Sequence, residues 1–336
     1  MTTFAANVRR IAAGLVLLVL LAFGMWAWHL THGGFEISVA DLAAKYQLPD
    51  SHFADIDGVR VHYVDQGQGP AIVLVHASNM NLRTWDQLAA ALRATHRVVR
   101  FDMMMSGLSG APSSGDFSIN RNLAILDELT KKLALDKFSV LGTSSGGIVA
   151  FRYAALHPEH VDRLILVNCA GLPRTAATDP NRARGTALER WINHYYRSYD
   201  YWQKTLTTQF GGGTAPPADF VKMVYDTNRR AGLVDFGARY ISAFSTGDPE
   251  GMLAKVRART LILWGIGNIT VDHLQADVFE HWLTGAPTLK IKYSKVGHYL
   301  YLEIPDRFNR DVAKFLNGEF DSQLRITTRS PMPQIR

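Results

Sequence analysis

Residues 137–154 read KFSVLGTSSGGIVAFRYA, and this stretch decides the fold of the chain. A strand-like run ends near Leu141, a turn rich in glycine and serine follows, and an apolar helical pattern begins at Gly146. A buried strand, a sharp turn and a helix in this order form the repeating unit of open α/β sheets. The turn itself reads Gly142-Thr143-Ser144-Ser145-Gly146-Gly147.

A serine between two glycines in such a turn is typical of a nucleophile elbow. The turn forces the serine into a strained backbone conformation, so the positions two before and two after it must be nearly free of side chains. In this register Ser144 is the candidate nucleophile, and Ser145 offers its backbone N–H from the start of a helix. The competing interpretation is a glycine-rich turn without catalytic meaning.

The rest of the chain supplies the other parts of an α/β sheet. Apolar runs such as IVLVH and LILVN are nearly continuous, as expected for strands covered on both faces. We expect strands at 53–56, 59–64, 71–76, 97–102, 138–142, 164–168, 260–264 and 288–293. We expect helices at 85–94, 119–133, 146–156, 273–283 and 305–316. The fold class is therefore α/β, an eight-stranded, mostly parallel sheet with helices on both faces.

The alternation of strands and helices stops between the sixth and seventh strands. Residues 173–256 read as helical and carry twelve aromatic residues, and they are too many for a loop in a compact domain. We expect a helical lid inserted into a core formed by 53–172 and 257–318. Trp191 and Trp202 are candidate lining residues of an apolar pocket beneath it. Residues 31–52 form a spacer with a short helix, and 319–336 form a basic tail.

The N-terminal segment, residues 1–30, has the character of a membrane anchor. Residues 11–28 carry no charge and nearly reach the length that crosses a bilayer, with Trp26 and Trp28 at the far end. Arg9 and Arg10 precede this run, which predicts a cytoplasmic N-terminus and a periplasmic or otherwise extracytoplasmic catalytic domain. The alternatives are a cleaved signal peptide, which gives a secreted protein, and a buried helix.

Composition excludes several classes of protein. The 336 residues carry a net charge of +6, but the basic residues are scattered, so we expect no nucleic-acid partner. A single cysteine, Cys169, excludes an internal disulfide framework and a cysteine-based metal cluster. No H-E-x-x-H or comparable spacing is present, and we expect neither metal nor cofactor. The expected partners are a small-molecule substrate and the membrane; the oligomeric state stays open.

A serine hydroxyl needs a base to become a nucleophile, and we expect that base after the last strand. There, residues 290–308 read KIKYSKVGHYLYLEIPDRF, which places His298 in a loop that leads to a helix. Position therefore distinguishes His298 from the other histidines of the chain.

From about Asp55 to Leu316 the chain resembles the α/β-hydrolase superfamily, in its lidded branch of esterases, lipases and C–C bond hydrolases. The features that carry the resemblance are His76, Trp85, Asp102…Gly107-x-Ser109, the Ser144 turn, Trp264-Gly265 and Gly297-His298. The resemblance implies Ser144 as nucleophile, His298 as base, and an oxyanion hole from the N–H groups of Ser145 and of Ala77 or Ser78. It also makes His76 and Met105 candidate pocket residues. A branch that uses aspartate at the elbow is disfavoured by Ser144.

Three positions depart from the family pattern. Ala77 and Met105 stand where the family usually has glycine. Met105 either lines an adaptable pocket or fills the core. The acid that orients the histidine usually lies four residues after the strand-seven tryptophan, and here that residue is Asn268.

Three readings of this last departure remain. In the first, Asp272 reaches His298 from the same loop or helix start. In the second, the uncharged amide of Asn268 orients the histidine. In the third, the acid comes from elsewhere or is missing. The first carboxylate after strand six, Asp179, lies eleven residues beyond Asn168, too far for this role. We expect a serine hydrolase that cleaves a carboxylic ester of a largely apolar small molecule. The alternatives are a C–C bond hydrolase on the same two residues and a membrane-tethered binding protein on an impaired site.

Overall fold

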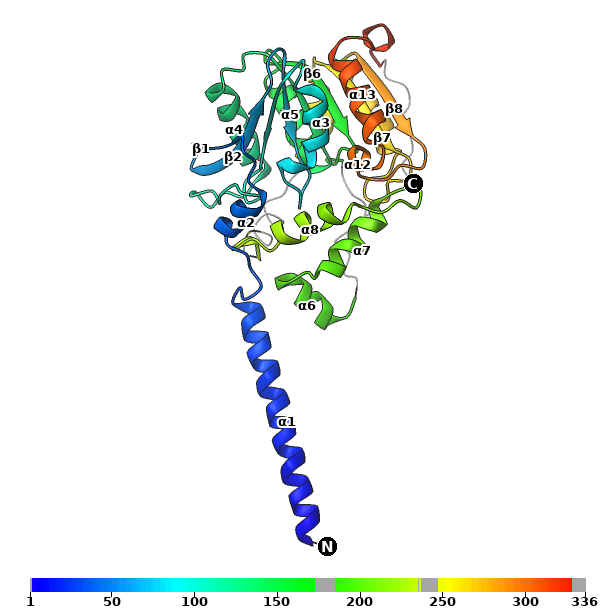
Figure 1. The fold of residues 1–336 in the computed structure, drawn as a ribbon. Coiled ribbons are helices and arrows are strands. Elements are labelled where there is room, and N and C mark those ends of the chain that lie inside the picture. Colours follow the sequence, from blue (N-terminus) through cyan, green and yellow to red (C-terminus); the bar gives the residue numbers. More distant parts are fainter. Residues whose placement is uncertain (1, 173–184, 235, 237–246, 328–336) are drawn as a thin grey trace.

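The computed structural model describes residues 2–172, 185–234, 236 and 247–327, and it contains an eight-stranded sheet in the order β1-β2-β4-β3-β5-β6-β7-β8. β1 pairs with β2 and β2 with β4 in antiparallel fashion, and every other pairing is parallel (Figure 1). The expected fold class is confirmed. The parallel arrangement brings the carboxyl ends of β3 to β8 to one edge, where ligands bind in open α/β sheets.

The strands are β1 (Ser51–Ile56), β2 (Val59–Gln66), β3 (Ala71–Val75), β4 (Arg97–Phe101), β5 (Phe138–Thr143), β6 (Val161–Val167), β7 (Arg259–Gly265) and β8 (Thr288–Tyr293). All eight predicted strands are present. The largest difference is at β6, which begins three residues earlier than expected because Asp162 and Arg163 belong to it. Arg163 is buried against Asp321 by two hydrogen bonds, so the charged residues that hid the start of the strand are paired in the folded protein.

The helices of the core and its N-terminal extension are α1 (Thr2–Thr31), α2 (Val39–Tyr46), α3 (Asp86–Leu92), α4 (Ile119–Lys132), α5 (Ser145–Leu156), α11 (Gln275–Trp282), α12 (Leu300–Glu303) and α13 (Pro305–Leu316). The short 3-10 helices η1 (Leu82–Trp85) and η2 (Asp321–Gln323) complete this set. Trp85 therefore ends a 3-10 turn rather than starting α3. The Asn81 side chain accepts the N–H of Arg83 and starts that turn early.

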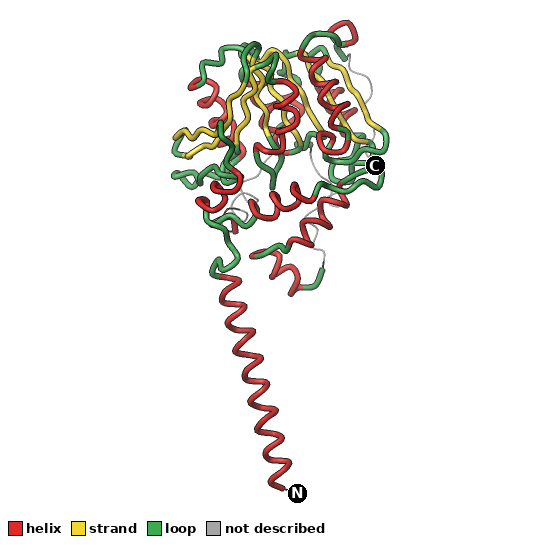
Figure 2. Tube along the Cα trace, in the orientation of Figure 1, coloured by secondary structure: helices red, strands yellow, loops and turns green. Residues whose placement is uncertain are grey.

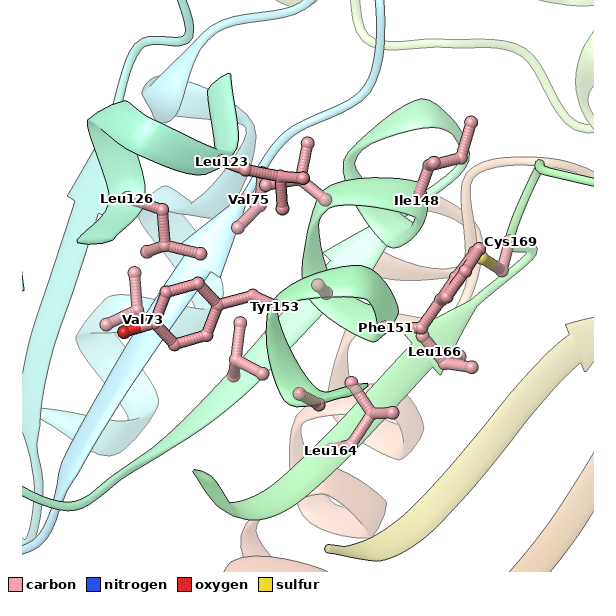
Figure 3. Close-up of a cluster of buried hydrophobic side chains, with 14 of the residues drawn as sticks. Val73, Val75, Leu123, Leu126, Ile148, Phe151, Tyr153, Leu164, Leu166 and Cys169 are labelled. Atoms are coloured by element: carbon pink, nitrogen blue, oxygen red, sulfur yellow. The ribbon is translucent and has the colours of Figure 1, made fainter. Parts of the chain in front are cut away.

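Helices cover both faces of the sheet (Figure 2). The sheet thereby separates two hydrophobic layers. On one face α4, α5 and α11 pack on alternate strand residues, and Figure 3 shows Phe151 and Tyr153 of α5 among Val73, Leu164 and other strand side chains. On the other face α3 and α13 pack with part of the lid. This two-sided burial explains the nearly continuous apolar runs of the strands and holds their carboxyl ends rigidly.

Between β6 and β7 the chain forms α6 (Ala187–Tyr195), α7 (Tyr199–Gln209), α8 (Ala218–Thr227) and α10 (Pro249–Leu253). α7 and α8 lie below the sheet, and α6 lies lower, beside the carboxyl end of α1 (Figure 1). Parts of the predicted lid and tail, 173–184 with Asp179, 235, 237–246 and 328–336, lie outside the described residues.

The α1 helix projects away from the rest of the protein (Figure 1). Its segment Ala6–Thr31 is long and apolar enough to cross a membrane, and none of its most apolar window is buried by the protein. A buried core helix is therefore not what this segment forms. The helix fits a membrane anchor or a signal sequence.

Candidate active site

Ser144 occupies the sharp turn between β5 and α5. Its backbone has φ 50° and ψ −122°, a strained conformation for a residue with a side chain. Two hydrogen bonds tie it to β6 and the following loop, from the Ser144 N–H to the Val167 carbonyl at 3.0 Å and from the Ala170 N–H to the Ser144 carbonyl at 3.0 Å. The turn is therefore sharp and strained at Ser144, as the steric argument from the sequence predicts.

The two glycines that flank Ser144 are there for steric reasons. A Cβ atom at Gly142 lies 2.4 Å from the Gly146 carbonyl oxygen, and a Cβ atom at Gly146 lies 2.3 Å from the His76 carbonyl oxygen. Both contacts are with backbone atoms, which cannot rotate away. The close approach of β3, β5 and α5 at this edge therefore requires glycine at both positions.

The loop after β3 is attached to the elbow by the side chain of Ser145. The Ser145 hydroxyl oxygen accepts from the Ser78 N–H at 2.7 Å and from the Ser78 hydroxyl at 2.8 Å. In the described part of the chain, no hydrogen bond from the N–H of Ala77 or of Ser145 is present. Of the two candidates after β3, Ala77 is thus the residue whose N–H is available to a substrate oxygen.

His76 is fully buried, and both of its ring nitrogens bond to the backbone. Nε2 accepts the Met103 N–H at 3.0 Å, so Nδ1 carries the proton and donates to the Ala77 carbonyl at 2.7 Å. Burial lowers the pKa of His76, which keeps the ring neutral. The ring therefore links the loop after β3 to the loop after β4 and fixes the peptide that carries the Ala77 carbonyl.

His298 follows β8 and is held by contacts on its backbone. The Gln209 carbonyl, at the end of α7, accepts the His298 N–H at 2.8 Å, and the Asn168 amide donates to the His298 carbonyl at 2.9 Å. The Glu303 carboxylate accepts the N–H groups of Gly297 at 2.8 Å and of Tyr299 at 3.1 Å. Three elements (α7, the end of β6 and α12) thus fix the position of the imidazole.

Of the two candidate orienting residues, Asn268 contacts the His298 ring, with 3.2 Å between its Oδ1 and the histidine Nδ1. The same Oδ1 accepts the N–H groups of Thr270 at 2.9 Å and Val271 at 3.1 Å. Because two backbone donors face this atom, it must be the oxygen, and the histidine Nδ1 must carry a proton. In the neutral ring with this tautomer, Nε2 is the nitrogen that can accept a proton.

Asp272 makes a different contact. Its carboxylate accepts the Leu274 N–H at 2.8 Å in the turn before α11, so it stabilises a local turn. The amide nitrogen of Asn268 is buried and has no hydrogen-bond partner among the described residues. A carboxylate at this position has no N–H group, so no buried donor would be left without a partner. The surroundings of Asn268 therefore suit an aspartate side chain.

The remaining candidate residues are Met105, Trp202 and Trp191, and each makes contacts elsewhere in the protein. Met105 is buried with φ 57°, a conformation that glycine adopts without strain, which explains why glycine is usual at this position. Its sulfur accepts from the Arg230 guanidinium at 3.1 Å. Trp202 is buried in the lid beside Tyr201, whereas Trp191 is half-buried and packs against Trp26 of α1.

Two positioning residues, Asn168 and Glu303, are absent from the sequence-based prediction. Asn168 is fully buried with φ 42°, and its amide also accepts the Gly265 N–H at 3.0 Å, so it connects β6, β7 and the His298 loop. A polar residue directly after an apolar strand at the catalytic edge is the only sequence signal for it. Glu303 lies five residues after His298, where a carboxylate can reach back to the preceding loop.

Known proteins are similar to this chain over most of its length. A cis-3-alkyl-4-alkyloxetan-2-one decarboxylase of Shewanella oneidensis is 25% identical over 291 residues, which cover 79% of this chain and 87% of the relative. A 2-hydroxy-6-oxononadienedioate/2-hydroxy-6-oxononatrienedioate hydrolase of Pseudomonas putida is 26% identical over 275 residues, 78% of this chain and 93% of the relative. The crystal structure of a bacterial membrane phospholipase A matches in fold with a TM-score of 0.67 at 24% identity, covering 92% of this chain and 98% of that one.

A family model described as the alpha/beta hydrolase fold matches residues 70–305, which contain the Ser144 turn and the His298 loop. This match spans well over half of the chain. The chain belongs to the α/β-hydrolase family.

Proposed function

We propose that the protein is a serine hydrolase that cleaves a carboxylic ester, or a related acyl bond, of a largely apolar small molecule. One observation carries the proposal: Ser144 stands in a strained turn at the carboxyl edge of the sheet, and His298, in the tautomer that a base requires, is held at the same edge. The φ 50° conformation at this serine is strained, and strained residues cluster at functional sites, which supports a catalytic role for the turn.

In the proposed reaction, the Ser144 Oγ attacks the carbonyl carbon of the substrate while Nε2 of His298 takes its proton. The negative charge that develops on the carbonyl oxygen is stabilised by the N–H groups of Ala77 and Ser145. The protonated His298 then gives the proton to the leaving alcohol, and an acyl-serine forms. Water, deprotonated by His298, attacks the acyl group and releases the acid and Ser144.

Asn268 gives this reaction an unusual electrostatic setting. Its amide oxygen orients the imidazole through Nδ1 but supplies no negative charge to stabilise the imidazolium that forms in the transition state. We therefore propose slow or specialised hydrolysis. Substrates with good leaving groups suit such a site, because they need less help from a general acid.

A second candidate is C–C bond hydrolysis on the same serine and histidine. The observation that favours it is the sequence similarity to the 2-hydroxy-6-oxononadienedioate/2-hydroxy-6-oxononatrienedioate hydrolase of Pseudomonas putida, which extends over 93% of that protein. The two functions differ in the bond that breaks after proton transfer, and a substrate panel separates them.

The experiment that tests the proposal is labelling of the full chain with a fluorophosphonate probe, followed by aryl esters of increasing acyl length. We expect covalent labelling of the protein and none of Ser144→Ala, with ester turnover reduced at least about a thousandfold in that variant. Ser294→Ala, an exposed serine near the same loop, is the matched control and should be labelled normally. Near-normal turnover by Ser144→Ala, or no labelling of the unmodified protein, contradicts the proposal and favours a binding role.

We further propose that α1 stays in the mature protein as an anchor, with the hydrolase domain on the extracytoplasmic side. The support is the pair Arg9 and Arg10 before the apolar span, and the contact of Trp26 with Trp191 of the lid. A helix that packs against the folded domain adds to its structure, whereas a signal peptide is removed from it.

A further inference from the structure

A cavity of about 280 Å³ lies where α1 ends, outside the Ser144–His298 centre. Its walls come from three segments that are far apart in the sequence: residues 30–36, 195–197 and 228–234. The first segment follows the apolar span, and the other two belong to the lid. The cavity is therefore located at the level where α1 would leave a membrane.

The cavity carries an excess of positive charge. Arg197, Arg229 and Arg230 all line it, and no carboxylate among the described residues forms an ion pair with any of them. Arg229 donates to the Phe35 carbonyl at 2.8 Å and stacks on Tyr225, and Arg197 lies over Tyr201 and Trp202. The one acidic residue in the lining, Glu36, accepts the N–H of Gly232 at 3.3 Å.

Arg230 is the cation that most clearly lacks a partner. The residue is only 5% exposed, its Nε has no hydrogen-bond partner in the described structure, and its recorded guanidinium contact is the weak acceptor Sδ of Met105. Among the described residues no carboxylate forms an ion pair with Arg230, although the charge of Asp102 acts on it from farther away. Burying a guanidinium without a directly paired counter-charge is costly, and an arginine does not lose its proton to escape that cost. A bound anion would remove the cost.

The cavity adjoins the loops of the catalytic edge. Arg230 touches Met105 in the loop after β4, and Asn228, another lining residue, donates to the Asn79 carbonyl at 2.8 Å. Asn79 lies two residues beyond Ala77, the candidate oxyanion donor. A ligand anchored in the cavity is thus held beside the segments that shape the catalytic centre.

The lid beside the cavity also lies next to the end of the apolar span of α1. The α6 helix has no buried residue, its Leu188 is 55% exposed, and its Trp191 packs against Trp26 of α1. Leu188, Trp191, Ile192 and Tyr195 repeat at helical spacing and form an apolar face of α6, which is exposed at Leu188 and half-buried at the other three positions. Such helices lie at the interface of a bilayer.

We propose that this cavity binds the phosphate of a membrane lipid head group, with Arg230 as its principal ligand, and thereby presents an acyl ester of that lipid to Ser144. Guanidinium groups bind phosphate through paired hydrogen bonds, and basic residues at a membrane surface attract anionic lipids. The proposal rests on the proposed hydrolase function and adds a substrate class to it.

The test compares two substrates that differ only in the phosphate, a monoacylglycerol phosphate and the monoacylglycerol with the same acyl chain, in neutral detergent micelles with the full chain. We expect a kcat/KM ratio of phosphate to neutral substrate above about ten. In Arg230→Gln the ratio falls at least about tenfold, and Arg230→Lys, which keeps the charge, recovers part of it. Arg310→Gln, an exposed arginine of α13, is the matched control and keeps the ratio.

A binding measurement separates this proposal from the hydrolase itself. The Ser144→Ala protein is titrated, by tryptophan fluorescence, with the monoacylglycerol phosphate and separately with inorganic phosphate. We expect saturable binding of the lipid that is weakened at least about tenfold by adding Arg230→Gln. Inorganic phosphate that binds as tightly as the lipid identifies a free-anion site and overturns the lipid assignment. An unchanged substrate ratio in Arg230→Gln overturns it as well and leaves the hydrolase intact, whereas failure of fluorophosphonate labelling counts against the hydrolase alone.

Discussion

The oxygen of the Asn268 amide lies 3.2 Å from Nδ1 of His298, at the position where a charged acid usually completes such a site. The backbone around it suits an acid: two N–H groups point at one oxygen, and the amide nitrogen has no hydrogen-bond partner among the residues that the structure describes. The Asn268 amide can therefore orient the His298 ring, but it carries no negative charge that would stabilise the protonated ring.

Replacing Asn268 with Asp should therefore increase activity. The carboxylate keeps the contact with Nδ1, removes the unpaired buried donor and adds a charge that stabilises the imidazolium. We expect kcat on an aryl ester to rise roughly tenfold to a thousandfold, within the ~10⁴ that the reverse change costs a serine protease. The acidic limb of the rate profile should move to higher pH, because a neighbouring negative charge makes the histidine protonate more easily. Steady-state kinetics across a pH series measure both effects.

Two control variants make this result interpretable. Asn268→Ala should lower kcat because the imidazole loses its orienting acceptor. Asp272→Asn should leave kcat within about twofold, since that carboxylate bonds to the Leu274 N–H. A large loss in Asp272→Asn, together with no gain in Asn268→Asp, would assign the role of the acid to Asp272.

The hydroxyl of Ser145 should matter for the rate although it is not the nucleophile. Ser145→Ala leaves the Ser78 N–H without its acceptor and detaches the loop that carries Ala77 from the elbow. We expect kcat to fall about tenfold with little change in KM, because the N–H of Ala77 acts mainly in the transition state. Ser78→Ala is the matched comparison: it removes the hydroxyl contact but keeps the backbone one, so its effect should be smaller. Equal effects of the two variants would contradict this account.

The fold and the positions of the two candidate reactive residues, Ser144 and His298, could be predicted from the sequence for physical reasons. Strands covered on both faces need continuous apolar runs, and the turn at Ser144 needs glycine where a Cβ atom would meet backbone at 2.3–2.4 Å. Such requirements restrict which residue types can stand at neighbouring positions, so they can be recognised in the sequence. The start of β6 was harder to predict because Arg163 is buried with a partner, Asp321, that is distant in the sequence.

Contacts between distant segments leave no local pattern, and this limits prediction of the site. Spacing in the sequence does not show whether Asn268 or Asp272 contacts His298. It also does not show that Asn168 donates a hydrogen bond to the His298 carbonyl. Both contacts depend on where loops meet in space. The arginine-lined cavity is the clearest example. Arg230 reads as part of a scattered basic surface, and only folding buries it against Met105.

Retention of α1 predicts how the protein behaves in cells. The full chain should stay in the membrane fraction after an alkaline carbonate wash and be released by detergent, with the N-terminal residues present by intact mass. A reporter that is active only outside the cytoplasm, fused to the C-terminus, should be active. Replacing Arg9 and Arg10 with Gln should reduce that activity, since these cations set the orientation. A soluble protein that lacks the first thirty or so residues would instead identify a cleaved signal peptide.

The stability of the core should depend on Asp102, whose carboxylate lies buried after β4. It bonds to His62 Nδ1 at 2.7 Å and accepts the N–H groups of Leu82 at 2.7 Å and Leu108 at 2.8 Å. Burial raises the pKa of Asp102, but the hydrogen bond and charge of His62, together with smaller contributions, outweigh it and hold the pKa below its ordinary value. Asp102→Asn should cost about 3–5 kcal/mol of unfolding free energy at neutral pH, as for one partner of a buried pair.

The pH dependence of this loss tests its electrostatic origin. A carboxyl group whose pKa is lower in the folded protein stabilises the fold fully above its unfolded pKa of about 4, and that stabilisation is lost as the pH falls through the folded value. The difference in unfolding free energy between the unmodified protein and Asp102→Asn should therefore shrink below about pH 4. Urea unfolding of the full chain in neutral detergent at several pH values measures it, with Asp116→Asn, an exposed aspartate, as the control. A difference that stays constant down to low pH would mean that Asp102 acts through packing alone.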